Sequence, residues 1–257
     1  MAYPRLYTCD LARGRYSSAS STPDSASNSA QNAVDGDPNS LWFPGTITSI
    51  FKVVFAGSRI IRAVAFSNHN LSGGSVIIYV YHDGSPTMVT AETPVSTSQD
   101  FLLDLGEGIH EGTQAWIQLM HPTNYIKVGC ISVLGDYGYD SDGVLTQGEG
   151  YGLIELGGSD AGGITRPLPV GGDTGVRALQ SANGFTQFQQ ISAPSEVFTL
   201  PFELMRSSLD MELWRLWNAY YPHTRGEFSN PGFSKGVWFT SDEYSVGSPL
   251  ARYCVGE

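Results

Sequence analysis

The sequence is poor in charged residues, which make up 15% of its 257 residues. Hydrophobic residues make up 41%, which is enough for a core, so the composition excludes a disordered chain. Acidic residues outnumber basic ones by 25 to 14, and the formal net charge is -11. Because phosphate backbones are bound by clustered Lys and Arg, this balance argues against a nucleic acid as partner.

Cysteine and long apolar runs are also scarce. The three cysteines, Cys9, Cys130 and Cys254, lie far apart without a CxxC spacing, so neither a disulfide framework nor a zinc site follows from them. No stretch approaches the roughly 20 apolar residues of a membrane span. Residues 1–16 contain no apolar core of a signal peptide. We therefore expect a protein that folds with reduced thiols in cytoplasm and does not insert into a membrane.

Sequence motifs of catalysis are missing as well. There is no GxSxG elbow, no Walker loop and no HExxH. The acidic pairs Asp140/Asp142 and Asp242/Glu243 lie in polar turns, where solvated turn residues are the simplest interpretation. We therefore expect that the chain is not an enzyme.

What the sequence does contain is abundant Gly (30) and Pro (14) between short apolar runs, which favours many short strands. Residues 1–32 are rich in Ser and Ala and predict a loop or linker. Asp83-Gly84 is a turn signal. The rhythm of the strands is typical of a β-sandwich, and they are expected within residues 49–57, 59–71, 75–84, 100–106, 115–122 and 125–138.

The composition changes after Gly135 to a turn-rich, acidic stretch. We place a domain boundary there, which gives a first domain at 1–137 and a second, β-rich domain at 138–257. One amphipathic helix is expected near 208–221, because apolar residues recur on one helical face. Those residues are Leu209, Leu213, Leu216, Trp217 and Tyr220.

The stretch NAVDGDPNSLWF (32–43) raises the question of a metal loop. In the register of an EF-hand, Asp35 takes the first ligand position, but Ser40 and Thr46 stand where Gly and Glu are required. A turn is the simpler interpretation: Asp35 and Asn39 accept backbone N–H groups, and Trp42 enters the core.

The motif A-x-D-G-D-P-N-S-x-W at residues 33–42 resembles the signature near the start of discoidin-like domains, the coagulation-factor C-type and galactose-binding jelly rolls. The Ser/Ala-rich segment before this motif resembles the first region of that family, and the segments QAWIQLM and IKVGCISVLG resemble its last region, so the resemblance spans about residues 17–135. It implies an antiparallel jelly-roll sandwich in the first domain, followed by the second β-rich domain with its one amphipathic helix.

The same resemblance implies a structural calcium at the positions of Asp35 and Ser40, with Asp37 nearby. The family completes this site with an acid at the position that Cys130 occupies here. A neutral thiol is a poor ligand for a hard cation, so calcium is disfavoured and we expect no metal and no cofactor.

A second resemblance is to tail and tail-tip proteins of tailed bacteriophages. It is carried by AVAFSNHNLSGGSVIIYVYHDG (63–84) and, further on, by GFTQF, LDMELWRLWNAYY and GVWFTSD. It implies a structural virion protein of the tail, assembled in the host cytoplasm, that contacts copies of itself in a ring and other tail proteins. The candidate interface residues are Trp214, Tyr221, Trp238 and Phe239.

The alternative function is that of a carbohydrate-binding module that recognises host surface glycans. Jelly rolls of this type bind sugars through aromatic faces and polar hydrogen-bonding groups. The candidate residues are Trp42, His69, Tyr81 and His82.

Overall fold

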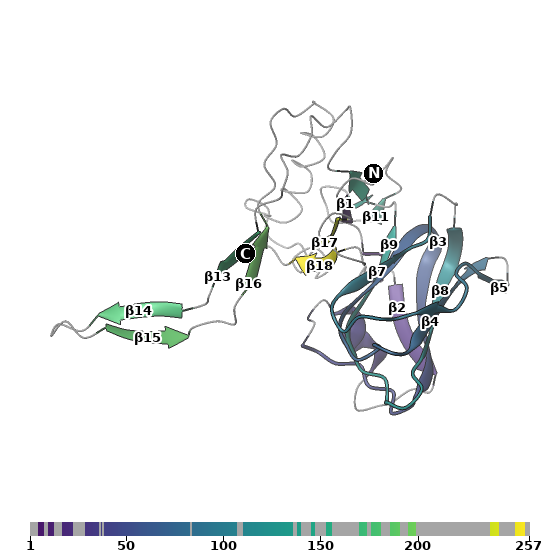
Figure 1. Cartoon of the computed structure of the whole chain (residues 1–257). Coiled ribbons are helices and arrows are strands. Elements are labelled where there is room, and N and C mark those ends of the chain that lie inside the picture. The colour runs from purple at the N-terminus through teal and green to yellow at the C-terminus, as the bar shows by residue number, and fades with distance from the viewer. Residues whose placement is uncertain are drawn as a thin grey trace. The chain divides into compact units, whose positions relative to one another are not determined.

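The computed structural model of the chain is mainly β, and its largest part is an antiparallel sandwich (Figure 1). It describes residues 5–7, 10–12, 17–22, 29–35, 37, 39–82, 84–106, 110–135, 138–139, 145–146, 153–155, 170–173, 176–180, 186–190, 195–198, 237–241 and 250–254. The predicted fold class is confirmed in its mainly β, antiparallel character. The elements of the sandwich are β2 (Ser17–Thr22), the 3-10 helix η1 (Ala30–Val34), β3 (Thr48–His69), β4 (Ser75–His82), β5 (Ser85–Met88), β6 (Thr93–Pro94), β7 (Phe101–Asp104), β8 (His110–Met120) and β9 (Val128–Gly135).

The long strand β3 belongs to both layers of the sandwich. Its first part, residues 48–54, pairs with β2 and β8, and its second part, residues 61–69, pairs mainly with β9 and β7. The register with β8 shifts between Val54 and Arg59, and this irregularity marks the corner where the chain passes from one layer to the other. The first layer continues from β8 to β4 and β5, and Figure 1 shows β3, β8 and β4 side by side.

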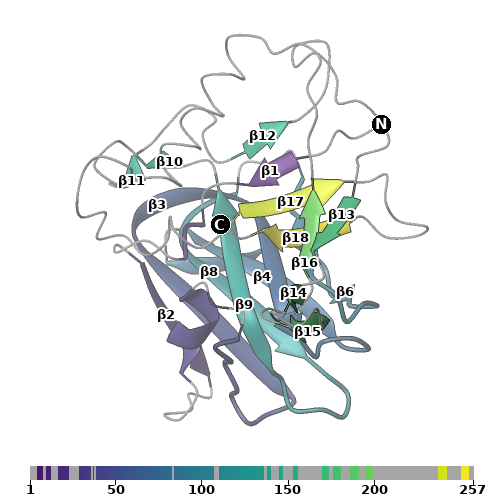
Figure 2. The same ribbon diagram turned by 90° about the vertical axis from the view of Figure 1, so that its left-hand side faces the viewer.

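Alternating side chains explain the strands of the first layer. In β4, Val76, Ile78 and Val80 are buried, while the residues between them are partly exposed. The same period of two runs along β8, as expected for a sheet with one face on the core. In contrast, β9 is buried throughout, and Figure 2 shows it crossing β8 and β4 in the other layer.

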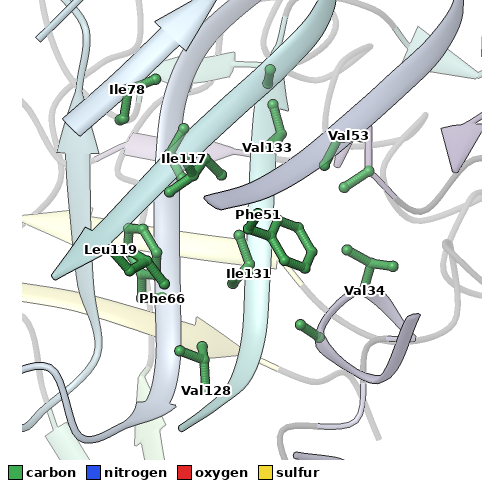
Figure 3. Packing of buried hydrophobic residues seen from close by; sticks show 14 of the residues in the cluster. Val34, Phe51, Val53, Phe66, Ile78, Ile117, Leu119, Val128, Ile131 and Val133 are labelled. Carbon is green, nitrogen blue, oxygen red and sulfur yellow. The ribbon is translucent and has the colours of Figure 1, made fainter. Parts of the chain in front are cut away.

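The core lies between the two layers (Figure 3). Phe51 and Ile117 face it from the first layer, Phe66 and Ile131 from the second, and all four side chains are fully buried. Burying a side chain of this size stabilises a fold by about 1.5 to 3 kcal/mol relative to leaving it exposed. Val34 of η1 closes one side of the core.

The second layer is also covered on its outer side, by a smaller apolar cluster of Tyr7, Ala63, Ala65, Leu134 and Trp238. Tyr7 and Trp238 come from a four-stranded antiparallel sheet that joins the start of the chain to its end. In spatial order its strands are β12 (Leu153–Glu155), β1 (Arg5–Tyr7), β17 (Val237–Ser241) and β18 (Leu250–Cys254).

The prediction of a loop for the whole Ser/Ala-rich segment was wrong, because Ser17–Thr22 forms strand β2. The edge of β3 supplies its hydrogen bonds, in a register that runs from Ser17 opposite Phe55 to Thr22 opposite Ile50. Of the predicted turn at Asp83-Gly84, Asp83 lies outside the described residues; Gly84 has a positive φ of 89°, and His82 pairs with Ser85, as the prediction requires.

The remaining strands form three two-stranded ladders. They are β10 (Gly138–Tyr139) with β11 (Leu145–Thr146), β13 (Val170–Asp173) with β16 (Ser195–Phe198), and β14 (Val176–Gln180) with β15 (Thr186–Gln190). The chain forms two compact units, Met1–Glu155 with Ser208–Glu257, and Leu156–Ser207. The domain division into 1–137 and 138–257 stays a prediction, and the helix expected near 208–221 lies outside the described residues. Within the described residues, no helix is long and apolar enough to cross a membrane.

Candidate functional site

The structure separates the four residues predicted to bind carbohydrate. Trp42 and His69 lie at one end of the sandwich, where both neighbour Val128 in the strand register. Tyr81 and His82 lie at the far end of β4, beyond the core residue Val80. Their carbohydrate-binding role stays a prediction, but they do not form one site.

Trp42 is a core residue, as the turn interpretation predicts. Its exposed fraction is 0%, its ring meets Phe51 edge-on at 5.0 Å, and its Nε1 donates to Ser21 Oγ at 3.2 Å. No face of the indole is therefore open for a ligand to stack on.

The acidic turn before Trp42 is held by its own backbone. Asp35 Oδ1 accepts the backbone N–H of Asp37 at 2.7 Å, and Asp37 Oδ1 accepts that of Asn39 at 2.9 Å. The Asx turn at Asp35 is confirmed, but the second one is formed by Asp37 rather than by Asn39. Among the described residues, no group of three or more His, Cys, Asp or Glu side chains is placed to hold a metal ion. Cys130 is buried, with its Sγ 3.7 Å from Ser132 Oγ.

His69 is built into the end of β3. Its Nδ1 accepts the backbone N–H of Leu71 at 3.2 Å, so Nε2 carries the proton and donates to the carbonyl oxygen of Gln99 at 2.8 Å. Burial lowers the pKa of His69 from its usual 6.5, against the raising effects of this hydrogen bond and of Asp100. The ring is neutral at pH 7, and both of its nitrogens are occupied.

Hydrogen bonds join the loops beside His69 to one another. Asn70 clamps the loop before β9: its Nδ2 donates to the carbonyl oxygen of Tyr125 at 2.8 Å, and its Oδ1 accepts the backbone N–H of Lys127 at 2.8 Å. The N–H of Ile126 donates to the carbonyl oxygen of Thr46 at 2.9 Å. These bonds tie the 121–127 loop to both the 41–47 loop and the end of β3.

Three side chains stand on this clamped backbone, and we call Phe43, Tyr125 and Lys127 the loop-end cluster. Tyr125 is 58% exposed, and its ring lies 6.2 Å from that of the half-buried Phe43 at an angle of 55°. Lys127 Nζ lies 5.5 Å from the centre of the Phe43 ring, a cation–π contact. Ile47, 42% exposed, lies on the adjoining loop.

His121 fixes the other half of the 121–127 loop. Its Nδ1 accepts the backbone N–H groups of Thr123 and Asn124, and its Nε2 donates to the carbonyl oxygen of Ser72 at 3.1 Å. The cluster therefore rests on a loop with hydrogen bonds at both of its ends.

The four predicted interface residues differ in whether the structure describes them and in how they are buried. Trp214 and Tyr221 lie outside the described residues. Trp238 is 1% exposed and packs in the small apolar cluster with Tyr7, so its ring is not open to another chain. Phe239 pairs with Leu6 and Arg252 within the four-stranded sheet. Their role in assembly stays a prediction.

The loop-end cluster was not predicted from the sequence, because Tyr125 was expected in the strand that follows. That strand begins only at Val128. The signal was the turn-forming HPTN at residues 121–124, which places the next aromatic residue in a loop.

No protein-family model matches the chain, and a search of curated proteins finds no match. Among solved structures, it is similar to the family 32 module CpGH89CBM32-6 of Clostridium perfringens, with 21% identity over 49% of this chain and 99% of that one, at a TM-score of 0.43. It is also similar to the family 32 carbohydrate-binding module of NanJ from C. perfringens in complex with galactose, with 14% identity over 51% and 98%, at a TM-score of 0.43. A third is an F5/8 type C domain from Bacteroides fragilis, with 17% identity over 51% and 96%, at a TM-score of 0.41.

None of these three is a phage tail protein, and the virion role stays a prediction. The F5/8 type C domain is of the class that residues 33–42 resemble. All three identities are below 25% and all three TM-scores are below 0.5, so these similarities do not assign a function to this chain.

Proposed function

We propose that the chain binds carbohydrate through the loop-end cluster. The observation that carries this proposal is the exposed ring of Tyr125, held against Phe43 on a backbone that Asn70 clamps. This is the alternative function expected from the sequence, placed on different residues.

The aromatic rings give the cluster its affinity for a sugar. The face of an aromatic ring carries partial negative charge, which attracts the weakly positive C–H groups on the flat face of a pyranose. Tyr125 has an exposed ring for this contact, and Phe43 extends the apolar surface beneath it. The same amphipathic rings bury area with little loss of conformational entropy.

Polar groups at the edge of the cluster can orient a bound sugar. The ammonium group of Lys127 and the phenol of Tyr125 can both donate hydrogen bonds to sugar hydroxyls. Because the loop is already fixed by Asn70, binding needs little further ordering of the backbone. A site of three side chains suits one or two sugar units, with dissociation constants of about 1 mM.

The test is saturation-transfer NMR followed by calorimetric titration with galactose, N-acetylgalactosamine and glucose. We expect at least one of these sugars to bind, and we expect Tyr125→Ala to weaken it about tenfold, or about 1.4 kcal/mol. Tyr125→Phe keeps the aromatic ring, so it is expected to lose less affinity than Tyr125→Ala. Ile47→Ala, a nearby exposed apolar residue outside the cluster, is the matched control with little expected effect. Absence of transfer from all three sugars, or equal loss in Ile47→Ala and Tyr125→Ala, contradicts the proposal.

A structural role in a virion has no specific observation among the described residues in its favour. Trp238 is buried within the chain. Assembly as a ring and the tail localisation therefore stay predictions.

A further inference from the structure

The outer face of the first layer carries a second group of aromatic and amide side chains, which lie on strands rather than on loops. We call it the sheet face, and it consists of Lys52, Tyr79, Tyr81, Gln114, Trp116 and Gln118. The registers place Lys52 opposite Trp116 and Trp116 opposite Tyr79, across the adjacent strands β3, β8 and β4. Gln114 lies opposite Tyr81. All six side chains are partly exposed.

The side chains of the sheet face hold one another in place. Trp116 and Tyr81 stack at 5.4 Å with an angle of 23° between their rings, and Lys52 Nζ lies 4.3 Å from the Trp116 ring centre. Trp116 Nε1 donates to Gln114 Oε1 at 2.8 Å. The rings are therefore fixed before any ligand arrives, which reduces the entropy cost of binding.

The second row of the face repeats this pairing of an aromatic ring with an amide. Tyr79 Oη donates to Gln118 Oε1 at 3.3 Å, and Gln118 Nε2 points to Met120 Sδ at 3.5 Å. At the edge of the face, Tyr81 Oη donates to the carbonyl oxygen of Gly84 at 2.6 Å. Within the described part of the chain, no hydrogen bond uses the amide N–H donors of Gln114, so both can face an external acceptor.

Charge narrows the choice of ligand. Among the described residues whose side chains the register places on this face of β2, β4, β5, residues 48–54 of β3 and residues 114–120 of β8, Lys52 is the one charged group. At the margins of the face, Arg59 pairs with Gly112, and Ser75 Oγ donates to the Glu92 carboxylate at 2.7 Å. The chain as a whole has a formal net charge of -11, which repels a polyanion. A neutral ligand that is rich in hydroxyl groups fits aromatic rings, amides and a single ammonium donor.

We propose that the sheet face is a second binding site, and that its ligand is a neutral linear polysaccharide. Tyr79 and Tyr81 lie two residues apart on β4, about 6.6 Å along the strand, and neighbouring strands are about 4.8 Å apart. The flat surface across three strands therefore offers aromatic and amide groups to several consecutive sugar units, where the loop-end cluster offers them to one or two. The site is independent of the loop-end cluster and does not rest on it.

A second copy of the chain is a poorer occupant of the face. A two-fold contact centred on Lys52 and Trp116 would bring two Lys52 side chains into one dry interface. An unpaired charge in such an interface is costly.

The test is affinity gel electrophoresis of the full chain in gels that contain hydroxyethylcellulose, galactomannan or a soluble β-glucan, with polygalacturonate as the acidic counterpart. We expect at least one neutral polymer to retard the chain. The dissociation constant is expected to rise at least tenfold in Trp116→Ala and in Tyr79→Ala. Thr87→Ala, on β5 with its side chain on the opposite face, is the matched control.

Gln118→Ala changes only a partly exposed amide, and it keeps the test decisive if Trp116→Ala fails to fold; it is expected to weaken binding severalfold. Retardation by polygalacturonate alone, or by none of the polymers, overturns the proposal. So does equal retardation of Trp116→Ala, when its melting curve shows a folded chain. A wild-type dimer in sedimentation that Trp116→Ala converts to a monomer identifies a second copy as the occupant and also overturns it.

Discussion

Asn70 holds Tyr125 from behind, because its Nδ2 donates to the carbonyl oxygen of Tyr125 at 2.8 Å while its Oδ1 accepts the N–H of Lys127 at 2.8 Å. The exposed ring thus stands on a backbone segment fixed by a residue far away in sequence. The position of the ring depends on the end of strand β3 as well as on its own loop.

The first prediction concerns this clamp. Asn70→Ala removes both hydrogen bonds, so we expect the amides of residues 125–127 to exchange faster with deuterium and the free energy of unfolding to fall by about 1 kcal/mol. Asn70→Asp keeps the acceptor for the N–H of Lys127 and loses only the donor to Tyr125. Its free energy of unfolding is therefore expected to lie between those of the wild type and Asn70→Ala. Unchanged exchange at these amides in Asn70→Ala would show that the loop is held by other contacts.

A second prediction uses two neighbouring glycines in the turn between β3 and β4. A Cβ on Gly74 would collide with the backbone carbonyl oxygen of Met120, whereas a Cβ on Gly73 meets nothing within 4 Å. Gly73 has a φ of +87°, which costs other residues about 1 to 2 kcal/mol. We therefore expect Gly74→Ala to lower the melting temperature more than Gly73→Ala, because β4 must move away from β8. An equal loss in the two variants contradicts the close approach of the strands.

A third prediction concerns pH and His69. Burial lowers the pKa of His69 below the 6.5 of the unfolded chain. The unfolded state therefore takes up the proton first as the pH falls. The stability that His69 contributes is complete above about pH 6.5 and is lost as the pH falls through its lower pKa in the folded state.

Denaturant unfolding at pH 7.5 and pH 5 measures this effect. His69→Gln removes the titrating ring, so we expect its free energy of unfolding to change less between the two pH values than that of the wild type. If the free energy of unfolding of His69→Gln changes as much between the two pH values as that of the wild type, the pH dependence arises from groups other than His69.

The strands of the sandwich were predictable because burial imposes a pattern on them. The alternation in β4, with Val76, Ile78 and Val80 inward, can be read directly from the sequence. Strand β2 has no such pattern: Ser17–Thr22 contains only Ser, Ala and Thr. It is a strand because the edge of β3 hydrogen-bonds to it, and that is a non-local cause.

The site was less predictable than the fold for the same reason. Trp42 follows a turn and enters a strand-rich region, so its burial was foreseeable. The exposure of Tyr125 and its contact with Phe43 depend on two loops that meet only in the folded chain. Similarly, Trp116 has the spacing of an ordinary strand residue, and only the register of three strands brings Lys52 and Tyr81 to it.

The last prediction concerns calcium at the acidic turn. Asp35 Oδ1 and Asp37 Oδ1 already accept backbone N–H groups at 2.7 and 2.9 Å. Two of the carboxylate oxygens that could coordinate a cation therefore already accept hydrogen bonds within the turn. The position at which the discoidin-like family places a further acid is the buried Cys130, whose thiol is a poor partner for a hard cation. We therefore predict that the turn holds its shape without an ion.

We expect the melting temperature to differ by less than about 1 °C between EDTA and millimolar calcium. Calcium that bound to the folded state would raise the melting temperature, so a difference this small means that the turn binds none. Asp37→Asn retains the side-chain oxygen that accepts the N–H of Asn39, so it is expected to melt close to the wild type. Asp37→Ala loses that acceptor and is expected to melt lower, with or without calcium. A fall of several degrees in EDTA that calcium restores, and that Asp37→Asn abolishes, would instead mean that the carboxylates of this turn coordinate calcium.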